Sequence, residues 1–352
     1  MDSHLAYRNN INPDHNLKNL EICTSLIDKN LQKIGEGMAG QVYKIESSKC
    51  GAIVLKKYVN IKSSEQIHIQ NEIYLMKEIK KLIDNNICPN YIYYYDSYID
   101  KNINKINNSY ILMEYADTHM LNFFDNIRDD IICDSFYFQL LVAIMCYQKY
   151  LKAVHTDIRL KNIVYKKINP DTVFNYNINN INYYIPTNGY LFMLIDYEQS
   201  QIYSDLNNNP KLLNKINSNY DFKHIQNIYR RPIKKYMRDN NMYSRSNMIN
   251  LIKNKSEKKK LLEYIKTLNN NNKNDDFIDT FIFHYILDNN FFDYSRLSNN
   301  LLDYIKYMEN LNKILFQNKS EKSIETILKE NFSKYLEPIE NPIKIETFII
   351  KF

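Results

Sequence analysis

The sequence predicts an α+β protein with two lobes, and three observations support this prediction. The N-terminal third contains alternating stretches rich in Val, Ile and Tyr, which are typical of strands. From Leu121 onward, apolar residues recur mainly at helical spacing. A linker is expected near residues 116–118, and 352 residues are enough for two lobes with a sizeable core.

Strands are predicted on both sides of a glycine-rich loop. Residues 31–57 should form three strands, of which one enters the loop, one leaves it at residues 41–45 and one starts at Ala52. The run 67–83 then carries apolar residues every three or four positions, so it predicts an amphipathic helix.

Two further strands and two further helices complete the clear predictions. The strands are expected at residues 91–98 and 110–115, with a turn at 102–108 between them. The helix predicted at residues 136–150 is apolar on most faces, so we expect it to be buried. A short amphipathic helix is expected at residues 14–30, in an N-terminal extension that spans residues 1–30.

Composition narrows the classes of function. The net charge of +6 fits an anionic substrate, but it is too small to predict binding of nucleic acid. Five scattered cysteines without a C-x-x-C pair indicate a reduced, intracellular protein that has no zinc site. We expect neither a signal peptide nor a transmembrane segment, and therefore a cytoplasmic location. The oligomeric state is not predicted.

Glycine is concentrated in one loop. The chain has only five glycines, and Gly35, Gly37 and Gly40 fall within six positions between two strand-like stretches. Because glycine has no Cβ, such a loop lets backbone N–H groups approach an anion, usually a phosphate. The G-x-G-x-x-G spacing is a weak signal alone, and the motifs that follow it strengthen it.

Those motifs follow the glycine loop in a fixed order. Residues 54–57 read Val-Leu-Lys-Lys, and the predicted helix after them has Glu72 near its centre. Residues 155–164 read His-Thr-Asp-Ile-Arg-Leu-Lys-Asn-Ile-Val, and residues 194–198 read Leu-Ile-Asp-Tyr-Glu.

In this order and spacing, from about Ile34 to about Asp221, the motifs resemble those of the protein-kinase-like superfamily. The resemblance implies a bilobal fold. Its N-lobe, at residues 31–116, would hold a five-stranded antiparallel sheet and one helix. Its C-lobe, at residues 117–352, would be mostly helical.

The resemblance also implies how the N-lobe would bind ATP. The three loop glycines would lie over the triphosphate, and Lys56 would contact the α- and β-phosphates. Lys57 is the alternative, but the two adjacent side chains point to opposite sides of a strand, so one alone can serve. Glu72 would orient that lysine from the helix.

The later motifs would supply the catalytic groups. Asp157 would accept the proton of the substrate hydroxyl, and Arg159 would neutralise the γ-phosphate during transfer. Asn162 and Asp196 offer hard oxygen ligands that suit Mg²⁺, with Mn²⁺ as an alternative. His155 is expected to pack in the core and support the loop.

The adenine site is expected to combine apolar walls with backbone hydrogen bonds. Backbone groups of Glu114 and Ala116 would bond to the base. The walls would come from five apolar side chains, namely Val42, Val54, Met113, Val164 and Ile195.

The sequence departs from the pattern of this superfamily in several places. Thr156 replaces an arginine that usually meets a phosphorylated loop, so we expect activity that does not await that phosphorylation. Tyr197-Glu198 replaces Phe-Gly, which should hold the loop in one state. A longer segment than usual separates Asn162 from Asp196, and residues 166–190 should form a surface hairpin or loop. Asp221 would brace the catalytic loop or cap a helix.

The resemblance implies a serine/threonine protein kinase that uses ATP and Mg²⁺ and acts on a protein substrate. The departures and the Asn-, Ile-, Lys- and Tyr-rich composition further suggest a viral enzyme of the poxvirus type that acts in virion assembly, located in host cytoplasm or virion. Two alternatives remain: a small-molecule kinase of the choline or aminoglycoside phosphotransferase type, and a pseudokinase scaffold. The basic stretch at residues 253–260 is expected to be a solvated helix face.

Overall fold

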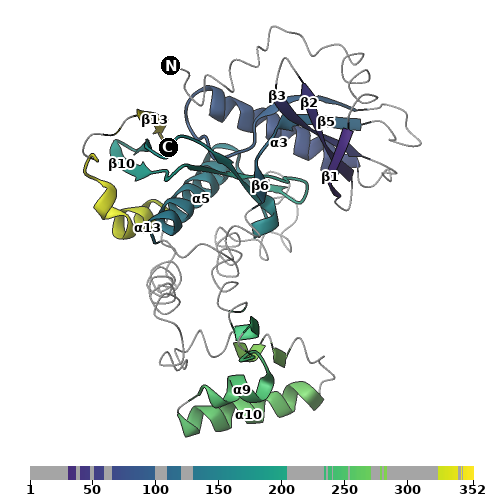
Figure 1. Ribbon diagram of the computed structural model, residues 1–352, viewed down its shortest axis with the longest axis vertical. Coiled ribbons are helices and arrows are strands. Elements are labelled where there is room, and N and C mark those ends of the chain that lie inside the picture. Colours follow the sequence, from purple (N-terminus) through teal and green to yellow (C-terminus); the bar gives the residue numbers. More distant parts are fainter. Residues whose placement is uncertain are drawn as a thin grey trace. The chain divides into compact units, whose positions relative to one another are not determined.

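The computed structural model divides into two compact units, which are described separately (Figure 1). The first unit comprises Met1–Leu121, Ile131–His224 and Ser320–Phe352, and the second comprises Asn122–Asp130 and Ile225–Lys319. The structure describes residues 31–36, 40–47, 51–58, 66–99, 109–119, 130–203, 234, 237–239, 241–252, 254–270, 278–279, 281–283, 324–339, 342 and 344–352. Outside these ranges lie the predicted helix at 14–30, the turn at 102–108, Gly37, Lys253 and Asp221.

A five-stranded antiparallel sheet forms the N-terminal part of the first unit (Figure 1). The strands lie in the order β1-β2-β3-β5-β4, so β5 pairs with both β3 and β4. This sheet and its helix confirm the predicted fold class. The strands are β1 Leu31–Glu36, β2 Gly40–Ser47, β3 Gly51–Tyr58, β4 Tyr94–Tyr98 and β5 Ser109–Glu114.

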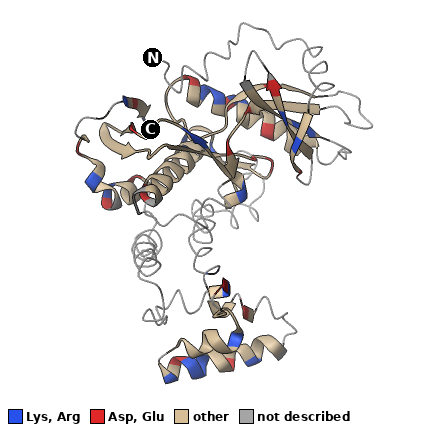
Figure 2. Ribbon diagram, in the orientation of Figure 1, with Lys and Arg blue, Asp and Glu red and all other residues tan. Residues whose placement is uncertain are grey.

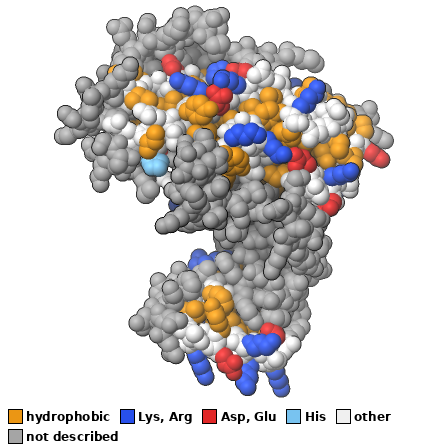
Figure 3. Space-filling model, turned by 180° about the vertical axis from the view of Figure 1, so that it is seen from behind, with side chains coloured by type: hydrophobic (Ala, Val, Ile, Leu, Met, Phe, Trp, Pro, Cys, Tyr) orange, Lys and Arg blue, Asp and Glu red, His pale blue; other side chains and the backbone are white. Residues whose placement is uncertain are grey.

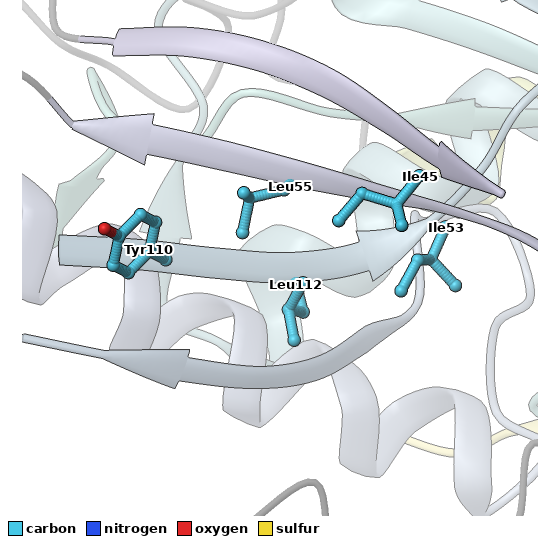
Figure 4. Packing of buried hydrophobic residues seen from close by; sticks show 5 residues of the cluster. All are labelled: Ile45, Ile53, Leu55, Tyr110 and Leu112. Carbon is cyan, nitrogen blue, oxygen red and sulfur yellow. The ribbon is translucent and has the colours of Figure 1, made fainter. Parts of the chain in front are cut away.

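One face of this sheet buries a cluster of apolar side chains (Figure 4). Residues two apart in a strand share a face, so Ile53 and Leu55 of β3 lie beside Tyr110 and Leu112 of β5. The opposite face of β3 therefore carries the even-numbered residues, including Lys56. The alternation of side chains along β3 thus places Lys56 on the face away from the apolar cluster.

The helix α3 (Gln66–Asp84) confirms the helix predicted after the third strand. Glu72 is buried on the same face of α3 as the apolar residues of that helix, with only 1% of its surface exposed. A buried carboxylate requires a partner, so this position marks a functional or structural pair. The buried apolar residues of α3 are Ile69, Ile73, Leu75, Met76, Ile79, Leu82 and Ile83.

The long helix α5 (Asp130–Tyr150) is the centre of the remaining core. Residues Phe136 to Tyr147 are all buried, as predicted. Figure 2 shows this helix almost free of charged residues. A helix that is apolar on all sides must be covered on all sides, and strands from later in the chain cover it.

Short strands flank the segments at residues 155–162 and 195–200, which contain the last two sequence motifs. β7 (Ala153–Val154) pairs with β12 (Gln201–Ile202). The strands β6 (Thr118–His119), β8 (Ile163–Lys167) and β11 (Tyr190–Leu194) form a second small sheet in the order β11-β8-β6. A one-turn 3₁₀ helix at Leu160–Asn162 lies between β7 and β8.

The segment at residues 166–190 forms a hairpin, as predicted, but the prediction of a surface element was wrong. β9 (Thr172–Ile178) and β10 (Ile181–Pro186) are joined by Asn179 and Asn180, which both have positive φ and suit a tight two-residue turn. One face of the hairpin packs on α5, where the ring of Phe138 lies 5.4 Å from that of Tyr176 and 5.3 Å from that of Tyr183.

The C-terminal strand β13 (Lys344–Ile350) completes this sheet and was not predicted. It pairs in parallel with β9, in the order β10-β9-β13. Phe348 is fully buried against Phe174 and Tyr176. Helix α13 (Ile324–Asn331) precedes β13. Tyr335, which lies between α13 and β13, donates a hydrogen bond to Asp134 of α5.

In the second unit the structure describes helices α9 (Arg245–Asn250) and α10 (Lys255–Asn270). Ser244 caps α9 by accepting a hydrogen bond from the backbone N–H of Asn247. On α10, Lys255, Lys259 and Lys260 are exposed, as expected of a solvated face. Figure 3 shows basic side chains, Lys or Arg, and a hydrophobic patch on the surface of this unit.

Candidate active site

The central contact of the site is an ion pair between β3 and α3. The Nζ of Lys56 lies 2.8 Å from Oε1 and 2.9 Å from Oε2 of Glu72. Lys56 points to the face of β3 opposite the apolar cluster, and Glu72 lies on the buried face of α3. Both partners are residues that the sequence named for this pair, with Lys57 as the alternative to Lys56.

The adjacent lysine does not join this pair. The Nζ of Lys57 lies 5.9 Å from the ring centre of Tyr110, on the other face of the strand. Of the two lysines left open by the sequence, Lys56 is the one that the structure places beside Glu72.

Two more carboxylates approach Lys56 from the segment after β11. Oδ1 of Asp196 lies 3.3 Å and Oε2 of Glu198 lies 3.7 Å from its Nζ. Burial alone would lower the pKa of Lys56, but the three carboxylates outweigh burial and raise that pKa. The lysine is therefore a firmly fixed positive charge at neutral pH.

Glu198 experiences the opposite balance. Burial raises the pKa of its carboxyl, and the nearby charges of Glu72 and Asp196 add to the rise, while Lys56 opposes it. Glu198 stands where the superfamily has a glycine, and its contact with Lys56 was not predicted from the sequence.

The second part of the site is built around Asp157. Its Oδ2 lies 2.9 Å from Nη2 of Arg159 and accepts a hydrogen bond of 2.8 Å from Nδ2 of Asn162. Both contacts go to the same oxygen, so Oδ1 is the atom that would face a substrate hydroxyl. The side chain of Asp157 is 26% exposed, and that of Arg159 is 57% exposed.

Asn162 and Asp196 fit the donor set that Mg²⁺ requires. Nδ2 of Asn162 donates to the carbonyl and to the carboxylate of Asp157, so its amide oxygen is the atom that would bind a cation. The backbone N–H of Ile195 donates to the carbonyl of Asn162 over 3.0 Å, which places the two expected ligands on adjoining segments. Among the described residues, no three His, Cys, Asp or Glu side chains gather to hold a metal ion. Two oxygen ligands suffice where substrate phosphates and water supply the rest.

Backbone contacts fix the catalytic segment to the segment after Asp196. Nε2 of His155 lies 3.1 Å from the carbonyl oxygen of Ile195, which fits the supporting role predicted for this histidine. Oγ1 of Thr156 donates to the carbonyl of Gln199 over 2.7 Å. Tyr197 is fully buried, stacks on Tyr147 and donates to the carbonyl of Leu194. Thr156, which stands where the superfamily usually has an arginine, thus links the segment around Asp157 directly to the segment after Asp196 through a hydrogen bond.

The predicted adenine residues lie on the four strands β2, β3, β5 and β8 and on the segments that follow β5 and β11. Val54 of β3 lies opposite Met113 of β5, and Val164 lies on β8. Val42, Met113, Ala116 and Ile195 are all partly exposed. The N–H of Glu114 donates to the carbonyl of Tyr93, so it does not serve as a donor to a nucleotide.

The glycine loop connects β1 and β2. Gly35 and Gly40 lie at its two ends, and neither has the positive φ that favours glycine. A Cβ on Gly40 would come within 2.6 Å of the carbonyl oxygen of Lys57, whereas a Cβ on Gly35 would meet Val42 at 3.7 Å. Close packing against β3 is thus the reason for glycine at position 40.

Tyr58 is a further residue of the site that the sequence motifs do not include. Its hydroxyl donates to Oε2 of Glu72 over 2.5 Å, and none of its side chain is exposed. The signal was present in the sequence as the position two residues after Lys56, on the same face of β3.

A strand lysine paired with a helix glutamate, a fixed Asp–Asn pair and a second aspartate beside the lysine form the arrangement expected of a protein-kinase-like domain. Residues 29–173 accordingly match the protein kinase domain family. That match ends inside the β9–β10 hairpin, so the assignment of Asp196 rests on its contact with Lys56.

Two curated proteins illustrate the similarity. The serine/threonine-protein kinase pakC of Dictyostelium discoideum is 31% identical over 144 residues, which cover 39% of this chain and 28% of that protein. The probable serine/threonine-protein kinase 380R of Invertebrate iridescent virus 6 is 22% identical over 191 residues, or 48% of this chain and 35% of that protein. The matched part thus spans about a third of the length of these relatives.

Proposed function

We propose that this chain is a serine/threonine protein kinase that transfers the γ-phosphate of ATP to a hydroxyl of a protein substrate. The observation that carries the proposal is the contact of Lys56 with both Glu72 and Asp196, because it joins three elements into one phosphate-binding centre. Both similar proteins are named as serine/threonine kinases, which supports the same acceptor class.

The residues would divide the reaction between them. Lys56 would hold the α- and β-phosphates, while Oδ1 of Asp157 would accept the proton of the attacking hydroxyl. A bond forms between the hydroxyl oxygen of the substrate and the γ-phosphorus. The bond between the γ-phosphorus and the bridging oxygen to the β-phosphate breaks, and ADP leaves with the bonding electrons. Arg159 lies 2.9 Å from Asp157 and would neutralise charge on the transferred group.

Asn162 and Asp196 are the residues that would hold Mg²⁺ or Mn²⁺. When bound, such a cation neutralises the charge that develops on the phosphate oxygens. The chain itself provides the two oxygen ligands on segments that share a backbone hydrogen bond.

We further propose that the enzyme is viral and acts in virion assembly, in host cytoplasm or in the virion. One of the two similar proteins comes from an invertebrate virus, and the composition fits an AT-rich genome. Detection of the protein in purified virions would test this. If this protein occurred in uninfected cells and were missing from virions, the proposed viral origin would be contradicted.

A small-molecule kinase is the second candidate, and Glu198 is the observation that favours it. Choline- and aminoglycoside-type enzymes tolerate a residue other than glycine at this position. In this chain Glu198 adds negative charge beside Asp196, which would suit a cationic substrate.

The experiment is phosphate transfer from radiolabelled ATP by the purified protein, with Asp157→Ala as the paired variant. Phosphoserine or phosphothreonine formed by the unaltered protein alone would establish the protein kinase. Labelling that persists in Asp157→Ala would contradict it. ATP consumption that a hydroxylated amine accelerates, without protein labelling, would establish the small-molecule kinase.

A further inference from the structure

The Lys56–Glu72 pair has a third member on its buried side. Glu72 is held at both carboxylate oxygens by Lys56, and its Oε2 also accepts the hydrogen bond from Tyr58. Tyr58 and Lys56 lie two residues apart on one face of β3, so a single strand approaches Glu72 with a cation and a neutral donor.

The additional donor matters because Lys56 is shared. Its ammonium group faces three carboxylates, from Glu72 at 2.8 Å, Asp196 at 3.3 Å and Glu198 at 3.7 Å. One positive charge cannot neutralise three negative charges. The surroundings of each carboxylate therefore decide which of the three forms the shortest ion pair with Lys56.

Burial alone does not favour Glu72 in this competition. The side chain of Glu72 is 2% exposed, against 36% for Asp196 and 15% for Glu198. A carboxylate with so little access to water is the most costly of the three to leave ionised, and it needs hydrogen bonds from the protein. Tyr58 supplies such a bond without adding charge.

We propose that Tyr58 is a positioning residue, whose hydroxyl fixes the Glu72 carboxylate so that Lys56 and α3 stay aligned. It acts through Glu72 and does not contact a substrate. The part of this inference that concerns catalysis rests on the proposed kinase function. The part that concerns the position of α3 does not depend on it.

The test is Tyr58→Phe, with Tyr94→Phe as the matched control. Both changes remove one hydroxyl from a well-buried tyrosine of the same sheet, but the hydroxyl of Tyr94 bonds to Ser97. A hydrogen bond to a charged group is lost in Tyr58→Phe alone, so we expect kcat to fall roughly ten- to a hundredfold, with a smaller change in KM for ATP. Tyr94→Phe should leave both constants near their original values.

A mutant cycle separates positioning from a general structural role. Hydrogen exchange of the α3 amides should speed up by about tenfold in Tyr58→Phe, because one charge-assisted hydrogen bond no longer holds the helix. In the Glu72→Gln background, the same substitution should add little. Equal effects in both backgrounds, or no effect of Tyr58→Phe in either, would overturn the proposal.

The exchange measurement needs neither ATP nor a substrate, so it gives a result even if the chain proves not to be a kinase. Should Tyr58→Phe not fold, tyrosine-selective NMR of the unaltered protein reads the same bond. A slowly exchanging hydroxyl proton on Tyr58 that is lost in Glu72→Gln supports the proposal, and rapid exchange in both proteins contradicts it.

Discussion

Lys166 of β8 forms an ion pair with the buried Glu114 of β5, with 2.7 Å between Nζ and Oε1. The two residues are 52 positions apart in the chain. Oε2 of Glu114 also accepts a hydrogen bond from the backbone N–H of Tyr93. The pair thus ties the last residue of a strand in the five-stranded sheet to the strand that follows the catalytic segment.

Lys166→Met is expected to destabilise the protein, because it leaves the carboxylate of Glu114 buried without its cation. Loss of one partner of a buried pair costs about 3 kcal/mol or more, and the 17% exposure of Lys166 places the expected loss near that lower value. Urea unfolding measures it. Lys167→Met, at an exposed position, is the control, and adding Glu114→Leu to Lys166→Met should restore much of the loss. An unchanged unfolding midpoint in Lys166→Met would refute the role of the pair.

Lys56→Met and Lys57→Met form a matched pair of neighbours on opposite faces of β3. Lys56→Met removes the cation that contacts three carboxylates, so phosphate transfer should fall about a hundredfold or more. Lys57→Met removes a charge near the ring of Tyr110 and should change the rate little. Initial rates at saturating ATP decide the matter, and the reverse order of effects would assign the phosphate-binding role to Lys57.

The two described glycines of the loop should respond differently to alanine. In Gly40→Ala the new methyl group would lie 2.6 Å from the carbonyl oxygen of Lys57, so β2 and β3 must move apart. Such overpacking costs about 1–3 kcal/mol. In Gly35→Ala the methyl group meets Val42 at an ordinary 3.7 Å, and stability should be nearly unchanged. Thermal unfolding compares the two, and equal losses would show that packing at position 40 is not the constraint.

Glu198→Gln should raise the free energy of unfolding at neutral pH. Burial raises the pKa of Glu198, which means that the folded protein disfavours the ionised carboxylate. The penalty is present above the raised pKa and disappears as the pH falls below the ordinary value of 4.5, where both states are protonated. The advantage of the variant should therefore shrink on acidification. A less stable variant at pH 7 would show that the contact with Lys56 outweighs burial.

The folded protein should lose stability as the pH rises above about 10, because buried tyrosines keep their protons in the native state. Burial raises the pKa of Tyr94 to about 12, and it raises the pKa of Tyr58, Tyr91, Tyr176 and Tyr197 well above the ordinary value for tyrosine. The unfolded chain ionises near pH 10 and then binds fewer protons than the native state, so stability falls with pH. Urea unfolding at a series of pH values, followed with tyrosine absorbance, checks this. Tyr94→Phe should flatten the fall between pH 10 and 12, and an identical slope would contradict the assignment.

Sequence reasoning recovered the parts of the fold that depend on local pattern. The alternation in residues 31–57 and the helical spacing in 67–83 correspond to β1, β2, β3 and α3. Lys56, Glu72, Asp157, Asn162 and Asp196 were named as expected site residues because the motifs that contain them resemble those of the protein-kinase-like superfamily. Their geometry is now known, while their roles in catalysis stay predictions.

The features that were wrongly predicted or missed from the sequence depend on contacts between distant segments of the chain. The hairpin at residues 166–190 looked like a polar surface element because it is rich in Asn and Tyr. Tyr176 and Tyr183 of this hairpin are buried because α5 offers an apolar face and because β13 pairs with β9 from more than 160 residues away. No local pattern in Lys344–Ile350 indicates that partner.

By itself the sequence determined the strand and helix pattern around β3 and α3, because periodicity fixes which side chains share a face over a few residues. Its motifs, through their resemblance to the protein-kinase-like superfamily, also named the expected phosphate-binding and catalytic residues. The tertiary structure alone decided that Lys56 rather than Lys57 meets Glu72, that Tyr58 and Glu198 join them, and that Lys166 holds Glu114. These contacts depend on how β3, β5, α3, β8 and the segment after β11 pack together. Charge pairing acts over a few ångströms in space, whatever the separation along the chain.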